Sequence, residues 1–201
     1  MYMNISAMPD LQVPAAYDGK WSRLVKEIGY YFSSELLTTD DKNTLVNQFK
    51  EIIERENALI SKICFSYADS VADYDDLRQD ALINIWRGMK QFRNNASQRT
   101  WVYRVTINSC ISTIRKLNRH KHDSLDKLYS YVADNDDDRD SIEMMHGIIS
   151  RLGLQERATI MMWLDEMTYD EIADALGVNR NTVASRIRRI KEKIAKQFIK
   201  E

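Results

Sequence analysis

The sequence predicts an all-α protein, and three observations support this prediction. Both prolines, Pro9 and Pro14, lie near the start, so no later helix is interrupted by one. Apolar residues recur every three or four positions over most of the chain, which is the helical period. No window alternates apolar and polar residues convincingly as a strand would. With 201 residues, the chain has room for one or two small domains.

Residues 1–43 form a predicted N-terminal extension. Residues 1–19 contain both prolines and little periodicity, which indicates irregular structure or a tail docked on something else. Residues 20–37 carry apolar side chains at helical spacing, beginning with Trp21, Leu24 and Ile28, and are predicted to form an amphipathic helix. Such a stripe is usually core, and a partner-binding face is the alternative. Residues 40–43 are polar and predict a break in the chain.

Residues 44–118 are predicted to form a helical domain. A first helix runs from Leu45 to Ala68, and a second from about Tyr74 to Lys90 with Asp73 as its N-cap. The segment 92–99 is a polar loop, and Ser97 can cap a third helix that ends near Leu117. The two cysteines, Cys64 and Cys110, sit in apolar helical patterns, which favours buried free thiols over a disulfide or a metal site.

The acidic residues at the start of the second helix have two interpretations. A metal or acid/base site is conceivable at Asp75, Asp76 and Asp80, but no His or Glu elsewhere matches them at ligand spacing. The first turns of a helix favour acidic side chains because of the helix dipole. Capping together with a charged docking face is therefore the preferred interpretation.

Residues 119–140 are predicted to be an acidic linker, which also fits simple spacing and solubility. Five aspartates lie near its end: Asp134, Asp136, Asp137, Asp138 and Asp140. Two amphipathic helices follow, at 141–152 and 154–165, and belong to a C-terminal domain of residues 141–201.

The C-terminal domain contains a helix-turn-helix pattern between Thr168 and Lys191. Thr168 and Glu171 have the spacing of a capping box, and Gly177 supplies a residue tolerant of positive φ at the helix end. Asn179 can cap the second helix, whose apolar stripe includes Val183. Its opposite face is polar and rich in arginine, as in a helix that reads the DNA major groove. The alternative is a basic, solvated surface helix.

The distribution of charge supports contact with nucleic acid, although the formal net charge is only −1. From Arg87 to His122 there are nine Lys or Arg and no acidic residue, and from Arg180 to Glu201 there are eight basic and two acidic residues. Residues 123–178 hold fourteen acidic and four basic residues. Two basic blocks separated by an acidic one indicate two contacts with a polyanion.

Other kinds of site find no support in the sequence. His120, His122 and His146 are too scattered for a metal site, and no phosphate loop, nucleophile motif or paired catalytic carboxylate occurs. We expect no catalytic residue, no metal and no cofactor. No signal peptide and no apolar run long enough to span a bilayer is visible, so we expect a cytoplasmic protein without membrane insertion.

Two stretches resemble a known family. Residues 74–93 (YDDLRQDALINIWRGMKQFR) and 100–108 (TWVYRVTIN) closely resemble the second conserved region of bacterial RNA polymerase sigma factors, most nearly the short extracytoplasmic-function (ECF, group four) members of the sigma-70 family. Residues 152–196 resemble the C-terminal region of that group, with its YDEIAxxLG and TVxSR motifs. Two departures stand out: Gly153-Leu154 occupies the place of a common Leu-Pro, and residues 1–43 have no counterpart.

The resemblance implies a promoter-specificity subunit of RNA polymerase with three groups of binding residues. It implies docking on the clamp helices of the largest subunit by Asp75, Asp76, Arg78, Gln79, Asp80, Ile83 and Trp86. It implies melting and reading of the minus-ten element by Arg93, Asn94, Asn95, Ser97, Arg99, Trp101, Arg104, Asn108, Arg115 and Lys116. It implies reading of the minus-thirty-five element by Arg180, Asn181, Thr182, Ser185, Arg186, Arg188 and Arg189.

The resemblance further implies that the C-terminal domain touches the polymerase flap and that the acidic linker threads toward the active-site and RNA-exit channel. An anti-sigma factor or another regulator is an expected partner. The promoter sequence, the activating signal, the identity of a regulator and the role of residues 1–43 cannot be read from the sequence.

Two other functions are alternatives to a sigma factor. A helix-turn-helix operator-binding regulator would account for residues 152–198 but leaves the block from Asp75 to Lys116 unexplained. A nuclease using Asp73, Asp75 and Asp76 with magnesium has no further support in the sequence.

Overall fold

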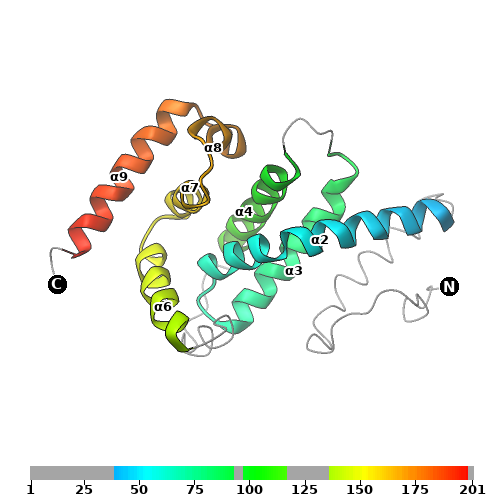
Figure 1. Cartoon of the computed structure of the whole chain (residues 1–201), viewed down its shortest axis with the longest axis horizontal. Helices are drawn as coiled ribbons and strands as arrows, with labels where there is room; N and C mark the ends of the chain where they lie inside the picture. Colours follow the sequence, from blue (N-terminus) through cyan, green and yellow to red (C-terminus); the bar gives the residue numbers. More distant parts are fainter. Residues whose placement is uncertain (1–38, 93–96, 117–135, 199–201) are drawn as a thin grey trace.

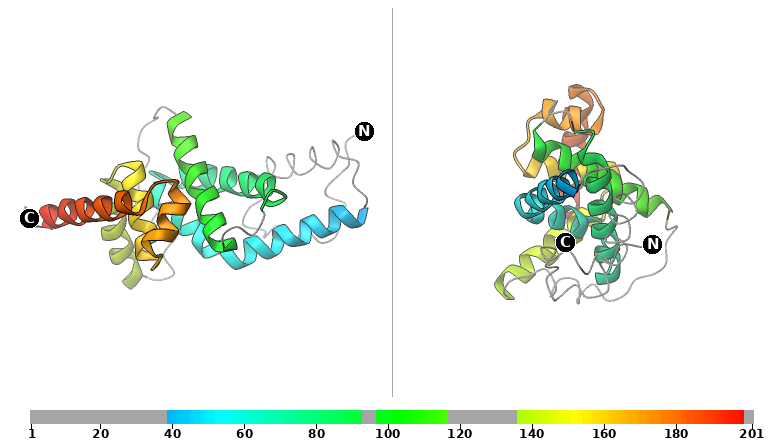
Figure 2. Two further views of the ribbon diagram at one scale, coloured as in Figure 1. Left: turned by 90° about the horizontal axis from the view of Figure 1, so that it is seen from above. Right: turned by 90° about the vertical axis from the view of Figure 1, so that its right-hand side faces the viewer.

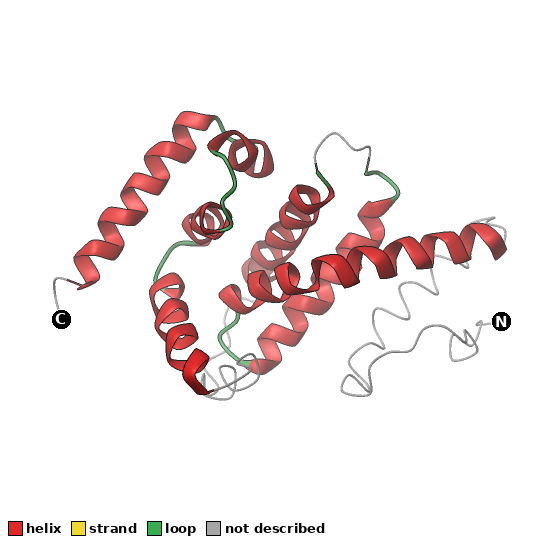
Figure 3. Ribbon diagram, in the orientation of Figure 1, coloured by secondary structure: helices red, strands yellow, loops and turns green. Residues whose placement is uncertain are grey.

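The computed structural model describes residues 39–92, 97–116 and 136–198 of the chain, and these residues form seven α-helices and no strand (Figure 3). The all-α prediction is confirmed. The helices are α2 (Thr39–Tyr67), α3 (Val71–Met89), α4 (Gln98–Lys116), α6 (Asp136–Ser150), α7 (Leu154–Leu164), α8 (Tyr169–Leu176) and α9 (Arg180–Phe198) (Figure 1).

Helices α2, α3 and α4 pack on one another as a three-helix bundle (Figure 1). Each contributes an apolar stripe at helical spacing, and the side chains of Ile63, Ile85 and Tyr103 are fully buried where the stripes meet. Phe49 and Trp86 meet edge to face, with ring centroids 5.3 Å apart. The predicted free thiols of Cys64 and Cys110 are confirmed as buried, with their Sγ atoms 3.9 Å apart.

The starts of two helices differ from the predictions. The predicted polar break at residues 40–43 is wrong: these residues belong to the beginning of α2, where the helix dipole favours Asp40 and Asp41. Asp73 does not cap α3. Ser70 does so instead, because its Oγ accepts a hydrogen bond from the Asp73 amide at 3.1 Å and donates one to Asp73 Oδ2 at 2.8 Å. Helix α3 therefore begins three residues earlier than predicted.

The start of α4 agrees with the prediction. The Oγ of Ser97 accepts a hydrogen bond from the Thr100 amide at 3.1 Å, which satisfies one of the free amides at the helix start. Helix α6 begins inside the predicted linker, because residues 136–140 are already helical. The predicted helix at 20–37 and the linker residues 119–135 lie outside the described residues.

Helices α6 to α9 form the second half of the chain. The prediction of a helix from 154 is confirmed: α7 starts at Leu154, and the Gly153 amide donates to Glu156 Oε2 at 3.1 Å. Ile172 of α8 and Val183 and Ile187 of α9 are buried between these helices. Helices α7 and α8 lie against the three-helix bundle, whereas the C-terminal part of α9 extends away from it (Figure 2).

Candidate nucleic-acid interface

The turn between α8 and α9 is built by local hydrogen bonds that the sequence predicted. The Thr168 amide donates to Glu171 Oε2 at 2.8 Å, and the Glu171 amide donates to Thr168 Oγ1 at 3.3 Å, which is the predicted capping box. The hydrogen bonds that the Thr168 amide and hydroxyl donate to the Glu171 carboxylate lower the pKa of Glu171. Gly177 has φ 65°, in the left-handed region that favours glycine. Asn179 Oδ1 accepts from the Thr182 amide at 2.8 Å, as predicted for the cap of α9.

The polar face of α9 divides into an exposed part and a braced part. Arg180, Asn181, Arg188 and Arg189 are exposed to solvent, and the other three predicted residues are half-buried. In the braced part, the Arg186 Nη1 donates to Thr159 Oγ1 of α7 at 3.1 Å, and the Ser185 hydroxyl donates to the Thr182 carbonyl at 3.0 Å. The exposed part is thus the surface that α9 offers to a ligand.

Two of the exposed arginines make weak contacts within the protein. Arg180 lies 3.4 Å from Asp170 and 5.6 Å from the centre of the Tyr169 ring, and Arg188 lies 3.7 Å from Glu192. Ion pairs between exposed side chains contribute little stability, typically about 0–1 kcal/mol, and are screened by salt. A phosphate group can therefore replace these carboxylates at low cost.

A second surface lies along α4. Trp101, Arg104, Asn108 and Arg115 follow one another at intervals of three, four and seven residues, so they share one face of the helix. Arg104, Asn108 and Arg115 are exposed, as is Lys116 next to them, and Trp101 is half-buried. One face of α4 thus combines an aromatic ring, an amide and several cations, which suits the stacking of bases and the pairing of phosphates.

The two aromatic residues near the start of α4, Trp101 and Tyr103, differ in burial. Tyr103 is fully buried in the bundle. The ring of Trp101 lies 5.1 Å from that of Phe92 and packs over Gly88, where an added Cβ atom would approach the Trp101 Cζ2 to 3.1 Å. Trp101 is therefore held at the edge of the bundle with part of its ring in solvent.

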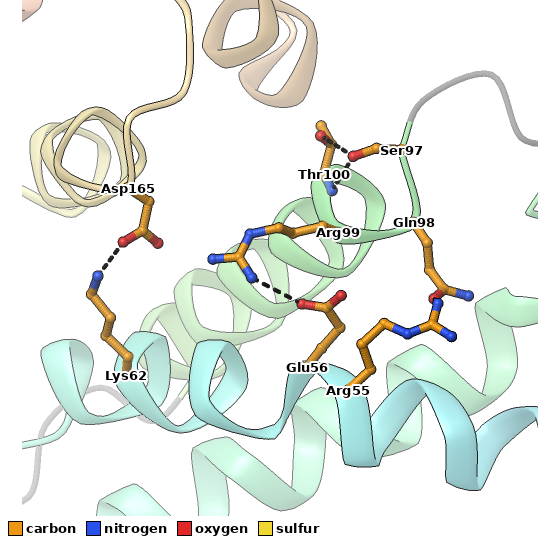
Figure 4. Close-up of polar contacts among 8 residues, drawn as sticks. All are labelled: Arg55, Glu56, Lys62, Ser97, Gln98, Arg99, Thr100 and Asp165. Atoms are coloured by element: carbon orange, nitrogen blue, oxygen red, sulfur yellow. Dashed lines mark hydrogen bonds and ion pairs between the residues drawn. The ribbon is translucent and has the colours of Figure 1, made fainter.

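The remaining residues predicted for the minus-ten element have varied placements. Arg93, Asn94 and Asn95 lie outside the described residues. Ser97 is the N-cap of α4, and Arg99 is exposed and pairs with the buried carboxylate of Glu56 at 3.3 Å (Figure 4). Ser97 therefore stabilises the start of α4, and Arg99 links α4 to α2.

The predicted polymerase-docking residues on α3 separate into two groups. Asp76 is exposed, and Asp75, Gln79 and Asp80 are half-buried. Asp80 lies beside α4, because its Oδ2 accepts a hydrogen bond from the Thr113 hydroxyl at 2.8 Å. In contrast, Arg78, Ile83 and Trp86 are buried. They are not on an open surface, because Ile83 and Trp86 belong to the core of the bundle and Arg78 Nη2 donates to Asn57 Oδ1 at 2.6 Å.

The described residues provide no group of three or more His, Cys, Asp or Glu side chains able to hold a metal ion. Asp73, proposed for a nuclease site, is bonded to Ser70 at the start of α3. His146 is buried, and its Nε2 lies 3.1 Å from the Ala68 carbonyl oxygen. Within the described parts of the chain, no helix is both long enough and apolar enough to cross a bilayer.

One important residue was missed by sequence reasoning. Arg157 of α7 is buried, and its guanidinium donates to the carbonyl oxygens of Ser66 at 2.8 Å and Ser150 at 2.7 Å. Burial lowers its pKa. The available signal was its spacing, since an arginine at the position between Leu154 and Met161 stands within the apolar stripe of this helix.

Two family models match this chain. Residues 52–120 match the family model for Sigma-70 region 2, and residues 142–194 match the model for Sigma-70 region 4. The chain is 27% identical over 150 residues to the ECF RNA polymerase sigma factor SigM of Mycobacterium tuberculosis, covering 74% of this chain and 76% of that protein. It is 27% identical over 165 residues to SigW of Bacillus subtilis, covering 75% and 88%.

Two solved structures share the fold. One is CnrH in complex with the cytosolic domain of CnrY, with a TM-score of 0.59, 18% identity and coverage of 88% of this chain and 97% of that chain. The other is the sigma factor RpoE in complex with the anti-sigma factor NepR from Bartonella quintana, with a TM-score of 0.57, 17% identity and coverage of 74% and 95%.

The α4 surface falls in the first matched region, and the α9 surface falls in the second. An operator-binding regulator would account for the second region alone and is not favoured. The chain belongs to the sigma-70 family of RNA polymerase sigma factors, in its ECF group.

Proposed function

We propose that this chain directs RNA polymerase to promoters through two separate DNA-reading surfaces and one polymerase-docking surface. The observation that carries the proposal is the occurrence of the α4 surface and the α9 surface in one chain, each within its own matched region. Its family consists of non-catalytic initiation factors, and we propose that this chain likewise contributes no catalytic group and acts in the cytoplasm.

The α4 surface is proposed to bind melted minus-ten DNA. Extruding a base from the duplex costs a few kcal/mol in lost stacking and pairing. Stacking on an aromatic side chain returns about 1–3 kcal/mol per base, and Trp101 is proposed to provide it. Arg104, Arg115 and Lys116 would pair with the phosphates of the displaced strand, and Asn108 has the donor and acceptor groups to contact a base edge.

The α9 surface is proposed to enter the major groove of the minus-thirty-five element. An arginine that bonds two acceptors of a guanine contributes about 1–3 kcal/mol of discrimination. Arg189 is the best candidate for this role, because it is exposed and the described residues engage it in no ion pair or hydrogen bond. Arg180 and Arg188 would contact phosphates once their weak partners are displaced. Arg186 is proposed to orient the helix from its braced position.

The acidic outer side of α3 is proposed to dock on core polymerase. Asp75, Asp76 and Gln79 are proposed as the contact residues, with Asp80 beside them at the junction with α4, and their charge suits a basic face on the clamp helices of the largest subunit. The buried residues Ile83 and Trp86 would support this helix from within. The C-terminal domain is proposed to touch the flap, and the acidic segment 119–140 to enter the channel where negative charge takes the place of RNA.

A protein regulator is proposed as a further partner. Of the two solved structures with this fold, one is the sigma factor RpoE in complex with the anti-sigma factor NepR, and the other is CnrH in complex with the cytosolic domain of CnrY. We propose that this chain is controlled in the same manner.

Run-off transcription tests the proposed function. Core polymerase is supplied with a pool of promoter fragments, with and without this protein. We expect discrete transcripts that depend on the protein, and their starts reveal the promoter. Absence of transcripts together with absence of binding to core polymerase would overturn the proposal. Transcripts that survive replacement of Trp101 and Arg189 by alanine would overturn the assignment of the two surfaces.

A further inference from the structure

The first turn of α4 is attached to the middle of α2 by two pairs of side chains (Figure 4). Arg55 Nη1 donates a hydrogen bond to Gln98 Oε1 at 2.8 Å. Arg99 Nη1 donates to Glu56 Oε2 at 3.3 Å. Arg55 and Glu56 are neighbours on α2, and Gln98 and Arg99 are neighbours on α4, so both pairs join the same two helical turns. We call these four residues the α2–α4 link.

The two members of the ion pair in this link differ in exposure. The Glu56 side chain is 5% exposed, whereas that of Arg99 is 57% exposed. A carboxylate that is taken out of water destabilises the fold unless a cation or hydrogen-bond donors replace its hydration. Arg99 supplies both a positive charge and a donor. Burial of Glu56 therefore favours an Arg99 side chain that lies against α2 over one that extends into solvent.

A second attachment of the same helix start involves α3. The Trp101 ring packs over Gly88 and lies 5.1 Å from the ring of Phe92, just after the end of α3. The helix start is also closed by its own cap, since Ser97 Oγ accepts from the Thr100 amide at 3.1 Å and lies 2.8 Å from the Thr100 hydroxyl. The position of the first turn of α4 is thus determined by the cap, by α3 and by the α2–α4 link.

The link adjoins residues that are proposed to read the minus-ten element. Trp101 and Arg104 follow Arg99 on the same helix. Residues 93–95, which the resemblance assigns to the same element, lie in the sequence between Phe92 and Ser97. Binding residues have to be held within about 0.5 Å of their productive positions by supporting contacts. Contacts that fix the start of α4 therefore bear on minus-ten recognition without touching DNA.

We propose that Arg55 and Glu56 are positioning residues for minus-ten recognition. They fix the start of α4 through Gln98 and Arg99, and Arg99 serves Glu56 rather than a phosphate of the DNA. This assignment changes the role of Arg99, which the resemblance places among the minus-ten contacts. The consequence for DNA rests on the proposed function, whereas the attachment of α4 to α2 does not.

Removing the charge of Glu56 distinguishes positioning from direct contact with DNA. If Arg99 positions α4, Glu56→Gln weakens the link and lowers the affinity for minus-ten DNA. If Arg99 instead pairs with a phosphate in the complex, Glu56 competes for it, and Glu56→Gln raises that affinity. Salt dependence gives a second criterion. Loss of a phosphate contact reduces the slope of log affinity against log salt concentration by about 0.7 on single-stranded DNA, whereas loss of a positioning contact leaves the slope unchanged.

The experiment measures binding of holoenzyme to a single-stranded minus-ten oligonucleotide and to duplex minus-thirty-five DNA by fluorescence anisotropy at several salt concentrations. Both DNAs are taken from a promoter that run-off transcription identifies. The test variants are Glu56→Gln, Arg55→Ala, Arg99→Ala, Arg99→Lys and the combination of Glu56→Gln with Arg99→Ala. The matched control is Glu54→Gln, an exposed neighbour on α2 with the same change of charge. Hydrogen exchange of the free proteins, followed by mass spectrometry, reports on the start of α4 without polymerase or DNA.

We expect Glu56→Gln, Arg55→Ala and Arg99→Ala to lower minus-ten affinity about three- to tenfold, the range that loss of one hydrogen bond produces. Their salt slopes and their minus-thirty-five affinities stay unchanged. Arg99→Lys retains most of the affinity, the combined variant binds no more weakly than Arg99→Ala, and Glu54→Gln binds as the unsubstituted protein does. Exchange accelerates in residues 97–104 of the three weakened variants and not in residues 180–190.

Three results would overturn the positioning role. The first is a rise in minus-ten affinity in Glu56→Gln, or a smaller salt slope in Arg99→Ala, since either assigns Arg99 to the DNA. The second is an equal loss of affinity for both DNA elements, which indicates a general structural role. The third is unchanged exchange at residues 97–104 in Glu56→Gln, Arg55→Ala and Arg99→Ala. Accelerated exchange there, in a protein whose unsubstituted holoenzyme initiates no transcription and binds neither DNA, overturns the proposed function alone.

Discussion

A Cβ atom added to Gly88 of α3 would lie 3.1 Å from the Cζ2 of Trp101 on α4. Such a contact is tighter than most Cβ contacts in proteins, so the indole has to shift by a few tenths of an ångström. The indole also packs against Phe92, with ring centroids 5.1 Å apart. The absence of a side chain at Gly88 therefore sets the position of Trp101.

We expect Gly88→Ala to reduce open-complex formation severalfold by displacing Trp101. Alanine has the higher helix propensity, by up to about 1 kcal/mol, so thermal stability should change little. The control is Gly147→Ala in α6, where an added Cβ meets nothing within 4 Å. That variant should gain stability and keep its activity. The measurements are permanganate footprinting of the promoter and thermal melting; equal footprints for both variants would contradict a role for the Trp101 position.

A second prediction separates two arginines of α9. Arg189→Ala should weaken binding to duplex minus-thirty-five DNA by about 1–3 kcal/mol, with no loss of stability, because the residue is exposed. Arg186→Ala removes the hydrogen bond to Thr159 Oγ1, so its midpoint of thermal unfolding should fall as well. Fluorescence anisotropy with holoenzyme and melting curves of the free protein make the comparison. If Arg186→Ala melts like the unsubstituted protein, the hydrogen bond between Arg186 of α9 and Thr159 of α7 does not contribute to stability.

The helix-turn-helix could be predicted in detail from the sequence because its signals are local. Thr168 and Glu171, Gly177, and Asn179 and Thr182 each specify one hydrogen-bonded cap or one backbone conformation over three or four residues. Such interactions require no knowledge of the rest of the fold.

The same reasoning failed where two local signals compete. Ser70 and Asp73 are both good N-cap residues, and their spacing is that of a cap and its third helical residue. Ser70 takes the cap, and Asp73 becomes its partner. Residues 40–43 were read as a break because they are polar, although acidic residues are equally suited to a first helical turn.

Contacts between the halves of the chain could not be predicted. Arg157 and Ser66 are 91 residues apart, and Arg104 and Asp174 are 70 residues apart. The hydrogen-bond acceptors are backbone carbonyls, which every residue possesses, so no side-chain pattern marks them. Trp86 belongs to the docking group that the resemblance implies, yet its ring is buried against Phe49, a contact that only the tertiary structure reveals.

A third prediction concerns the cap of α8. Thr168→Ala removes the hydroxyl that accepts from the Glu171 amide and donates to Glu171 Oε2. We expect a loss of about 1 kcal/mol in the free energy of unfolding, measured by urea denaturation. Thr168→Ser keeps the hydroxyl and should retain most of that stability. A serine variant as unstable as the alanine variant would indicate that the methyl group, rather than the cap, is responsible.

The last prediction concerns pH. Burial, and secondly the charge of Arg157, lower the pKa of His146 below its ordinary value of 6.5, although the Ala68 carbonyl and Asp69 oppose this. At a pH just below 6.5, His146 is therefore protonated in the unfolded protein but largely neutral in the folded protein. Stability must therefore rise with pH through the region below about 6.5 and be lost on acidification. Glu156 and Glu171 do not produce this trend, because their lowered pKa values place their own loss of stability at more acidic pH.

We expect the urea midpoint to decrease between pH 7.5 and pH 5.5 and the decrease to shrink in His146→Gln. Glutamine can still donate to the Ala68 carbonyl but does not titrate. His120 and His122 remain in the variant, so any residual slope reports on them. An unchanged slope in His146→Gln would mean that this histidine is not the titrating group.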